Sequence, residues 1–351
     1  MNSEFIEALE ELEKEKGISK DILLEAIEAA LISAYRKNFG SAQNVVVQIE
    51  RETGQVRVFA KKTVVEKVED ERTEISLEEA RKINLNFQVG DIVEQEVTPK
   101  NFGRIAAQTA KQIVVQRIRE AERSIIYEEF SGKEDDIVTG IVQRQEQKNV
   151  FIDLGKVEAI LTPAEQMPNE EYKQGDRIKV YITEVRRTTK GPQILLSRTH
   201  PGLLKRLFEL EVPEIHDGIV EIKSIAREAG SRSKIAVYSK NENVDPVGAC
   251  VGPKGMRVQA IVNELKGEKV DIVKWDADSN EYVANALSPA KVISVTSNEE
   301  EKVAQVVVPD YQLSLAIGKE GQNARLAAKL TGWKIDIKSE SQYNAENNKN
   351  L

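Results

Sequence analysis

Apolar residues in the first 130 positions follow helical and strand spacings in turn. Stripes at helical intervals predict one helix near residues 5–12 and a second near residues 22–31, behind Ser19 as a suitable cap. Alternation of apolar and polar residues over 45–60, broken by Thr53-Gly54, predicts a β-hairpin. Between residues 103 and 127 the chain contains no proline and no internal glycine, so we expect one long helix there that leads out of a first domain.

Residues 136–197 change to short strand patterns separated by glycine and proline. The strands are expected over 137–142, 150–154, 159–162, 177–184 and 193–197. Five strands in about sixty residues predict a small closed barrel of the OB type. The stretch VFIDLG at 150–155, followed by Gln174-Gly175-Asp176, resembles the S1 RNA-binding domain. That resemblance implies that Phe151 stacks against RNA bases, whereas its place in a strand is equally compatible with a side chain in the barrel core.

The strongest signal is an internal repeat with a period of about 66 residues, in which VGPKGM at 251–256 corresponds to IGKEGQ at 317–322. Each copy is preceded by two expected strands and a short helix, and is followed by an amphipathic helix and a strand. The expected strands are 218–225, 234–239 and 269–272 in the first copy and 291–296, 302–308 and 334–337 in the second. This order is that of the bacterial-type KH unit, which binds about four nucleotides of single-stranded RNA.

The paired glycines of each repeated turn have a chemical reason. Glycine lets the backbone approach a phosphate closely, and the first N–H groups of the following helix form an anion site. Such a turn could also be a plain corner between two helices. We expect an apolar groove beside the turns, lined by Val251, Val258 and Ile261 and by Ile317, Ala324 and Ala327. The candidate RNA-binding residues are Gly252, Pro253, Lys254, Gly255, Arg257, Gly318, Lys319, Glu320, Gly321, Gln322, Asn323 and Arg325.

Composition narrows the class of protein. A chain with 40% hydrophobic and 31% charged residues fits a soluble globular protein. No apolar stretch approaches the ~20 residues of a membrane-spanning helix, and the acidic start lacks the features of a signal peptide, so we expect a cytoplasmic protein. The single cysteine, Cys250, cannot form an internal disulfide, and two histidines give no familiar zinc set. We therefore expect no metal and no cofactor. A net charge of -8 requires any contact with RNA to be local.

A helix-rich front, an S1 barrel and two fused KH units together resemble the NusA family of bacterial transcription elongation factors. The most specific stretches are PKNFGRIAAQTAKQ at 99–112 and residues 317–332. The resemblance implies that the front domain binds RNA polymerase beside the RNA exit channel, with Lys37, Arg104 and Lys111 touching polymerase or an RNA hairpin. On physical grounds alone, these three residues are equally compatible with ordinary surface charges. It also implies that the rest of the chain holds nascent single-stranded RNA, and that the protein changes pausing, intrinsic termination and antitermination without being an enzyme. Other Nus-type antitermination factors are possible partners.

We therefore expect a monomeric, multidomain α+β protein of the family form that lacks C-terminal acidic repeats. The expected parts are an RNA polymerase-binding domain at 1–130, an S1 barrel at 131–199, KH units at 200–276 and 277–340, and a disordered tail at 341–351. One alternative is an RNA-processing enzyme related to polynucleotide phosphorylase, although there the KH unit precedes the barrel. Another is a ribosome-maturation protein or a protein-binding scaffold.

Overall fold

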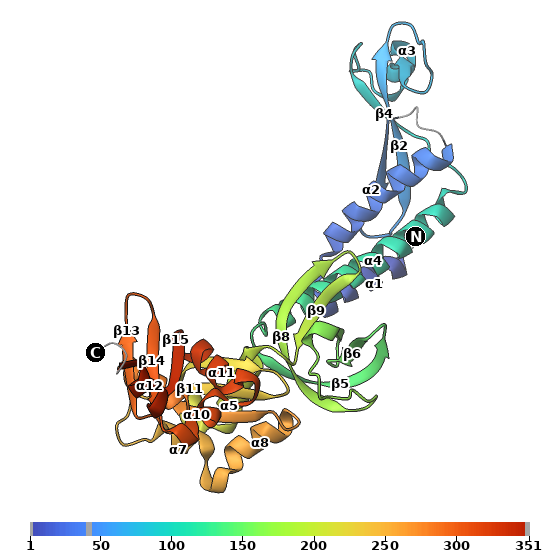
Figure 1. The fold of residues 1–351 in the computed structure, drawn as a ribbon. Coiled ribbons are helices and arrows are strands. Elements are labelled where there is room, and N and C mark those ends of the chain that lie inside the picture. The colour runs from blue at the N-terminus through green and yellow to red at the C-terminus, as the bar shows by residue number, and fades with distance from the viewer. Residues whose placement is uncertain (1–2, 40–43, 348–351) are drawn as a thin grey trace. The chain divides into compact units, whose positions relative to one another are not determined.

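The computed structural model describes residues 3–39 and 44–347 (Figure 1). The chain divides into two compact units, Met1–Ile125 and Ile126–Leu351. The second unit contains the barrel and both repeats.

The first unit is a mixed sheet with helices. It contains α1 (Ser3–Lys16), α2 (Lys20–Phe39), α3 (Leu77–Ile83), the first part of α4 (Phe102–Ser131), β1 (Val45–Ile49), β2 (Val56–Val65), β3 (Glu74–Ser76) and β4 (Ile92–Glu96). The predicted hairpin of β1 and β2 and the long helix α4 are both confirmed. β2 also pairs with β4 and β3, which the pattern did not predict. Leu23, Ile27 and Leu31 of α2 share one buried core with Val47 and Phe102, so the apolar stripe is the core face of the helix.

The barrel at the start of the second unit is closed, as predicted. Its strands are β5 (Ile137–Glu146), β6 (Asn149–Asp153), β7 (Glu158–Leu161), β8 (Arg177–Thr188) and β9 (Gly191–Ser197), in the order β5-β6-β7-β9-β8, with the 3-10 helix η1 (Pro163–Glu165) after β7. Val150 and Ile152 point into the barrel and are fully buried. A Cβ atom at Gly140 would lie 2.3 Å from a methyl carbon of Ile152, so glycine permits the close approach of β5 to β6.

The two KH units repeat one topology. The first contains α5 (Pro201–Glu211), α6 (Pro213–His216), β10 (Val220–Glu228), β11 (Arg232–Ser239), α7 (Pro246–Val251), η2 (Pro253–Gly255), α8 (Met256–Glu264) and β12 (Lys269–Lys274). The second contains α9 (Ser279–Ala286), β13 (Ser294–Asn298), β14 (Val303–Val308), η3 (Asp310–Gln312), α10 (Leu313–Ile317), η4 (Lys319–Gly321), α11 (Gln322–Thr331) and β15 (Lys334–Ser339). In each sheet the middle strand pairs antiparallel with the first strand and parallel with the last.

Each KH unit begins with a helix that the sequence analysis missed. His200 caps α5, since its ring Nδ1 accepts a hydrogen bond from the N–H of Gly202, and Pro201 stands at the first position of the helix. Asp278 caps α9 by accepting from the N–H of Asn280. β13 begins later than predicted because the N–H of Lys291 donates to the side chain of Gln312 rather than to a strand.

The expected tail at 341–351 is not disordered throughout. α12 (Glu340–Asn347) follows β15 directly, and residues 348–351 lie outside the described residues. Ser339 and Gln342 form a reciprocal cap, in which the hydroxyl of Ser339 accepts from the N–H of Gln342 and the Gln342 side chain accepts from the N–H of Ser339. Ser341 also donates to the carboxylate of Asp310. The Ser-x-x-Gln pattern at 339–342 is the signature of this helix start in the sequence.

Buried polar contacts join the barrel to the first KH unit. The guanidinium of Arg198, which follows β9, is fully buried and contacts the carboxylate of Glu170 and both the carboxylate and the main-chain carbonyl of Glu264 at the end of α8. Arg227 of β10 pairs with buried Glu268 at 2.9 Å and donates to the carbonyl of His200. A buried charge that loses its partner is strongly destabilising. These ion pairs therefore fix the position of the barrel relative to the first KH unit.

The two KH units share one hydrophobic core. Ala226, Ala236 and Val273 lie in the sheet of the first KH unit. They belong to the same buried cluster as Val283 and Leu326 of the second KH unit. A buried lysine adds a polar link, since the ammonium of Lys234 donates to the carbonyl of Ser288 at 2.6 Å and to Asp271 at 3.0 Å. Burial, opposed by the Asp271 carboxylate, holds the pKa of Lys234 below its ordinary value. The two turns are therefore carried on one continuous body.

Candidate nucleic-acid interface

The two glycine turns have nearly identical backbones. Gly252 and Gly318, which end α7 and α10, have φ of 73° and 79°, and Gly255 and Gly321, which begin α8 and α11, have φ of 76° and 74°. These angles lie in the left-handed region that favours glycine. The third residue of each turn, Lys254 or Glu320, also adopts a left-handed backbone, with φ of 53° in both. Two sequences with different middle residues thus form one structure.

Close packing adds a second requirement at the first glycine. A Cβ atom at Gly252 would lie 2.6 Å from Cγ of Arg257, and one at Gly318 would lie 2.8 Å from Cβ of Asn323. A Cβ atom at Gly255 would meet nothing within 4 Å. The second glycine is therefore needed for its backbone angle alone, and it leaves an open approach to the start of the helix.

The middle residues of both turns point to solvent. Pro253, Lys254, Lys319 and Glu320 are all exposed. Among the described residues, no carboxylate lies within ion-pair distance of the ammonium groups of Lys254 and Lys319. Neither α8 nor α11 has a side-chain cap at its start. Each turn thus combines an exposed lysine with an uncapped helix start, a combination that suits an anion, although the second turn also carries the exposed carboxylate of Glu320.

Two of the predicted RNA-binding side chains support the turns from inside. Arg257 donates to the carboxylate of Glu214 at 2.8 Å and to the carbonyl of Ala249 at 2.7 Å. Asn323 is 4% exposed, and its amide donates to the carbonyls of Leu287 and Ala316. Both residues follow the first glycine of their turn by five positions, so they are equivalent in the repeat. In both KH units this side chain donates hydrogen bonds within the protein and supports the turn.

Two more predicted residues are held by the first KH unit. Arg325 donates from Nε and Nη2 to the two oxygens of Glu228 at 2.6 and 3.1 Å, and Gln322 donates to Glu228 at 2.8 Å and to Ser231 at 2.7 Å. The hydrogen bond from Arg325 holds the pKa of Glu228 below its ordinary value, against partial burial. Arg325 also donates to the main-chain carbonyl of Glu320, inside the second turn. Glu228 was missed by sequence reasoning because its partner lies 97 residues away.

The expected apolar groove is only partly formed by the predicted residues. Val251 and Val258 are half-buried, and Ile317 is 37% exposed. Ile261 and Ala327 are fully buried and belong to the cores of their units, so the expectation that they line a groove is wrong. Along a helix, the residue that faces the core cannot also face a ligand.

Phe151 lies outside the barrel core. It is half-buried, and its neighbours Val150 and Ile152 take the inward positions. The guanidinium of Arg144 covers its ring, 4.1 Å from the ring centre, and Arg144 pairs with Glu146 and Glu158. The alternative of Phe151 as barrel core is thus wrong, and the outer face of the ring carries a cation in this structure.

The three basic residues predicted in the first unit are exposed. Lys37 lies near the end of α2, and Arg104 and Lys111 lie on α4. The rings of Tyr35 and Phe39 pack against Phe102, with centroids 5.8 and 6.3 Å away. This aromatic cluster places the end of α2 beside the start of α4, and so brings Lys37 to the same end of the unit as Arg104.

The fold and the two turns define a multidomain RNA-binding protein built from a barrel and tandem KH units. Family models match the chain in the same order, with the NusA N-terminal domain at residues 4–124, the S1 RNA-binding domain at 132–197, the NusA-like first KH domain at 198–275 and the NusA-like second KH domain at 279–345.

Whole-length relatives carry the same family name. The transcription termination/antitermination protein NusA of Halalkalibacterium halodurans is 72% identical over 342 residues, which cover 97% of this chain and 90% of the relative. The NusA of Bacillus subtilis is 70% identical over 341 residues, which cover 97% and 92%. A solution structure of the N-terminal domain of NusA from B. subtilis is 67% identical and covers 35% of this chain and 99% of its own, with a TM-score of 0.32. The chain belongs to the NusA family of transcription termination/antitermination proteins.

The described residues contain neither a candidate membrane-spanning helix nor a cluster of metal-ligand side chains. In residues 3–39 and 44–347, no helix is long and apolar enough to cross a membrane. Within the same ranges, no three or more histidine, cysteine, aspartate or glutamate side chains gather as metal ligands would.

Proposed function

We propose that this chain binds the RNA polymerase core through residues 1–130 and holds nascent single-stranded RNA on its barrel and its two KH turns. Pausing, hairpin-dependent termination and antitermination then change because the emerging RNA is held in place. No covalent chemistry is required, since each site acts by binding alone.

The observation that carries the proposal is the matched pair of turns on one body. Both turns present an exposed lysine and an uncapped helix start, and the shared core and the Glu228–Arg325 pair join their units. One RNA strand bound at both turns gains affinity from the high effective concentration of the second site. The turns would supply phosphate contacts, and Phe151 on the barrel would add a stacking face.

The contact with polymerase is supported by family membership and by the exposed basic residues of the first unit. Lys37, Arg104 and Lys111 are the residues we propose to touch polymerase or the RNA hairpin. Replacing all three with glutamate in the full chain should weaken capture of the polymerase core, whereas Lys254→Asp together with Lys319→Asp should leave that capture unchanged.

A transcription assay on a hairpin-pause template tests the whole proposal. The full chain should change the lifetime of the pause, and the variant with Lys254→Asp and Lys319→Asp should lose most of that effect. Lys266→Asp is the matched control, because Lys266 is exposed and has the same left-handed backbone, with φ of 53°, but lies at the other end of α8. Equal activity of the double variant and the wild type would contradict the proposal.

A further inference from the structure

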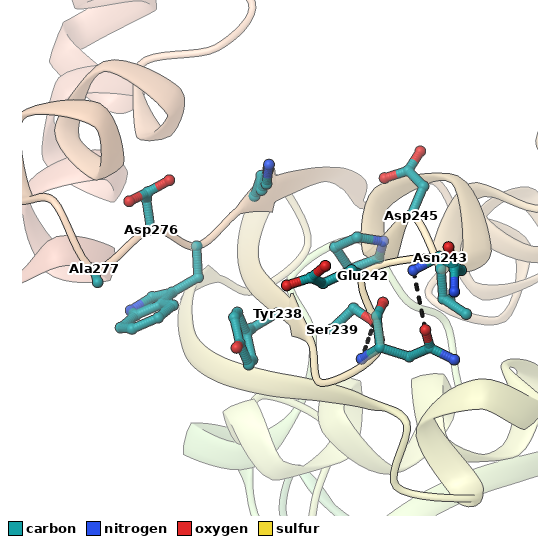
Figure 2. Close-up of a pocket in the computed structure, with 12 residues that line it drawn as sticks. Tyr238, Ser239, Glu242, Asn243, Asp245, Asp276 and Ala277 are labelled. Carbon is teal, nitrogen blue, oxygen red and sulfur yellow. Dashed lines mark hydrogen bonds between the residues drawn. The ribbon is translucent and has the colours of Figure 1, made fainter.

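A hollow of about 870 Å³ lies at the carboxyl ends of β11 and β12 (Figure 2), and its lining contains no residue of either glycine turn. Tyr238 and Trp275 contribute aromatic rings to it, and residues 239 and 241–246 also line it. Its volume is within the range of sites that bind small molecules. Nothing in the assigned functions of the KH turns uses these residues.

Tyr238 is exposed and Trp275 is half-buried, because the second KH unit covers only part of the first KH sheet. Ala236 and Val273 pack into the shared core, and Tyr238 and Trp275 follow two positions later on the same strand faces. Tyr238 is 38% exposed, and its ring lies edge-on to that of Trp275 with 5.4 Å between centroids. Because the two rings stand at 83° to each other, one planar ligand can stack on one ring and meet the other only at its edge.

The second KH unit closes the equivalent end of its sheet. In the second KH unit the connection between β14 and α10 is residues 309–312, whereas in the first KH unit the connection between β11 and α7 is the longer segment 240–245. In addition, α12 follows β15 without a linker. Ser341 of α12 donates to Asp310 and seals that end. Of the two KH units, the first therefore has the hollow, and the hollow is not part of the repeated glycine turn.

The charged groups of the hollow are three carboxylates and one lysine. The lining includes Glu242, Asp245, Asp276 and Lys274. Asp245 caps α7, and Asp276 accepts from the N–H of Asp278. Within the described part of the chain, no hydrogen bond or ion pair satisfies the carboxylate of Glu242, which Figure 2 shows facing the same hollow as Tyr238. The ammonium of Lys223, which is not among the lining residues, lies over the rings of Tyr238 and Trp275, 5.2 and 5.4 Å from their centres.

An aromatic face beside a free carboxylate selects among the nucleobases. A carboxylate only accepts hydrogen bonds, so it needs adjacent N–H donors on the ligand. Guanine offers two such donors on its Watson–Crick edge, at N1 and at the exocyclic amine, whereas adenine and cytosine each place a single amine beside a ring acceptor. Stacking on tryptophan or tyrosine suits any base and adds affinity without selecting. Lys274 stands in the same lining to meet a phosphate.

We propose that this hollow is a guanine-nucleotide site, in which the base stacks on Trp275 and meets the ring of Tyr238 at an edge, Glu242 binds its N1 and exocyclic amine, and Lys274 contacts phosphate. The guanine comes either from a free nucleotide or from the RNA strand, and only the second source rests on the proposed function.

Fluorescence of Trp275 tests the site directly. The chain has two tryptophans, and Trp333 is 6% exposed, so quenching by a ligand in the hollow reports on Trp275. We would titrate the full chain with GMP, AMP and CMP, and with the pentaribonucleotides UUGUU and UUAUU. We expect saturable quenching. The affinity for GMP should be about tenfold higher than for AMP or CMP, and the affinity for UUGUU about tenfold higher than for UUAUU, as expected for a two-bond base contact. Trp275→Phe should abolish the signal.

Three variants complete the test. Glu242→Gln should weaken guanine binding about tenfold, whereas Glu281→Gln, an exposed glutamate on α9, should leave it unchanged. The variant with Lys254→Asp and Lys319→Asp should still bind GMP, which separates this site from the RNA-binding turns. Quenching by UUGUU without quenching by GMP would assign the site to RNA, and quenching by GMP would assign it to a free nucleotide. Equal quenching by all bases, insensitivity to Glu242→Gln, or quenching by a basic peptide alone would overturn the proposal.

Discussion

Arg325, in the helix that follows the second glycine turn, forms a two-bond ion pair with Glu228 at the end of β10 in the first KH unit. The same arginine holds the carbonyl of Glu320 inside the turn, so Glu228 of one unit fixes the turn of the other. Glu228 therefore adds a polar contact between the first KH unit and the second glycine turn, beside the hydrophobic core that the two units share.

Replacing Glu228 with glutamine tests this coupling. We expect affinity for an RNA long enough to span both turns to fall about threefold to tenfold, because the second site is no longer held where the strand arrives. Binding of a tetranucleotide, which needs one turn, should not change. The arginine is 47% exposed, so the free energy of unfolding should fall by less than ~1 kcal/mol. Glu281→Gln is the control, and unchanged binding of the long RNA would contradict the coupling.

Acid should weaken the same contact in a defined pH window. The pKa of Glu228 is lowered from its ordinary value of 4.5, mainly by the hydrogen bond from Arg325. A carboxylate with a lowered pKa in the folded protein contributes its full stabilisation at a pH above its ordinary pKa. That stabilisation is lost as the pH falls through the lowered pKa. The difference in affinity between wild type and Glu228→Gln for the long RNA should be constant from about pH 7 to about pH 5 and should shrink below. A difference that already declines near neutral pH would be inconsistent with this pair.

Phe151 and its neighbour Ile152 should behave in opposite ways. Phe151→Ala should reduce RNA affinity of the barrel with little change in stability, because the ring lies outside the core. Ile152→Ala should lower the free energy of unfolding by about 2–5 kcal/mol, because that side chain is fully buried. Denaturant titration and RNA binding, measured on both variants, check the contrast. A large loss of stability in Phe151→Ala, with RNA affinity unchanged, would assign the ring to packing.

Arg198 should be essential to the join between the barrel and the first KH unit. The variant Arg198→Met leaves the carboxylate of Glu170, 2% exposed, without its cation, so we expect the second unit to lose about 3–5 kcal/mol of stability. Adding Glu170→Met should recover much of the loss, because the unpaired buried charge is then gone. Chemical denaturation of the wild type and of both variants measures this. No recovery in the double variant would show that another contact dominates.

Much of this architecture could be predicted from the sequence, because local patterns encode it. Alternation gave the five strands of the barrel, and the two glycine turns identified the KH units, since left-handed angles at Gly252 and Gly318 demand glycine. The helices α5 and α9 were missed although proline and aspartate caps mark their starts.

The candidate site was predicted less completely, for a physical reason. Arg257, Asn323 and Arg325 have the residue types of RNA ligands, and only the fold shows that their donors already have protein partners. Glu228 and the Tyr238–Trp275 pair depend on contacts between distant parts of the chain, which spacing along the sequence does not carry.

The most direct test of the central claim is the salt dependence of RNA binding by the full chain. If the two turns hold phosphates, the logarithm of affinity should fall linearly with the logarithm of salt concentration, with a slope of ~0.7 for each phosphate contact. The variant with Lys254→Asp and Lys319→Asp should bind more weakly and with a shallower slope, whereas Lys266→Asp should match the wild type. The same affinity and slope in the double variant as in the wild type would contradict the account.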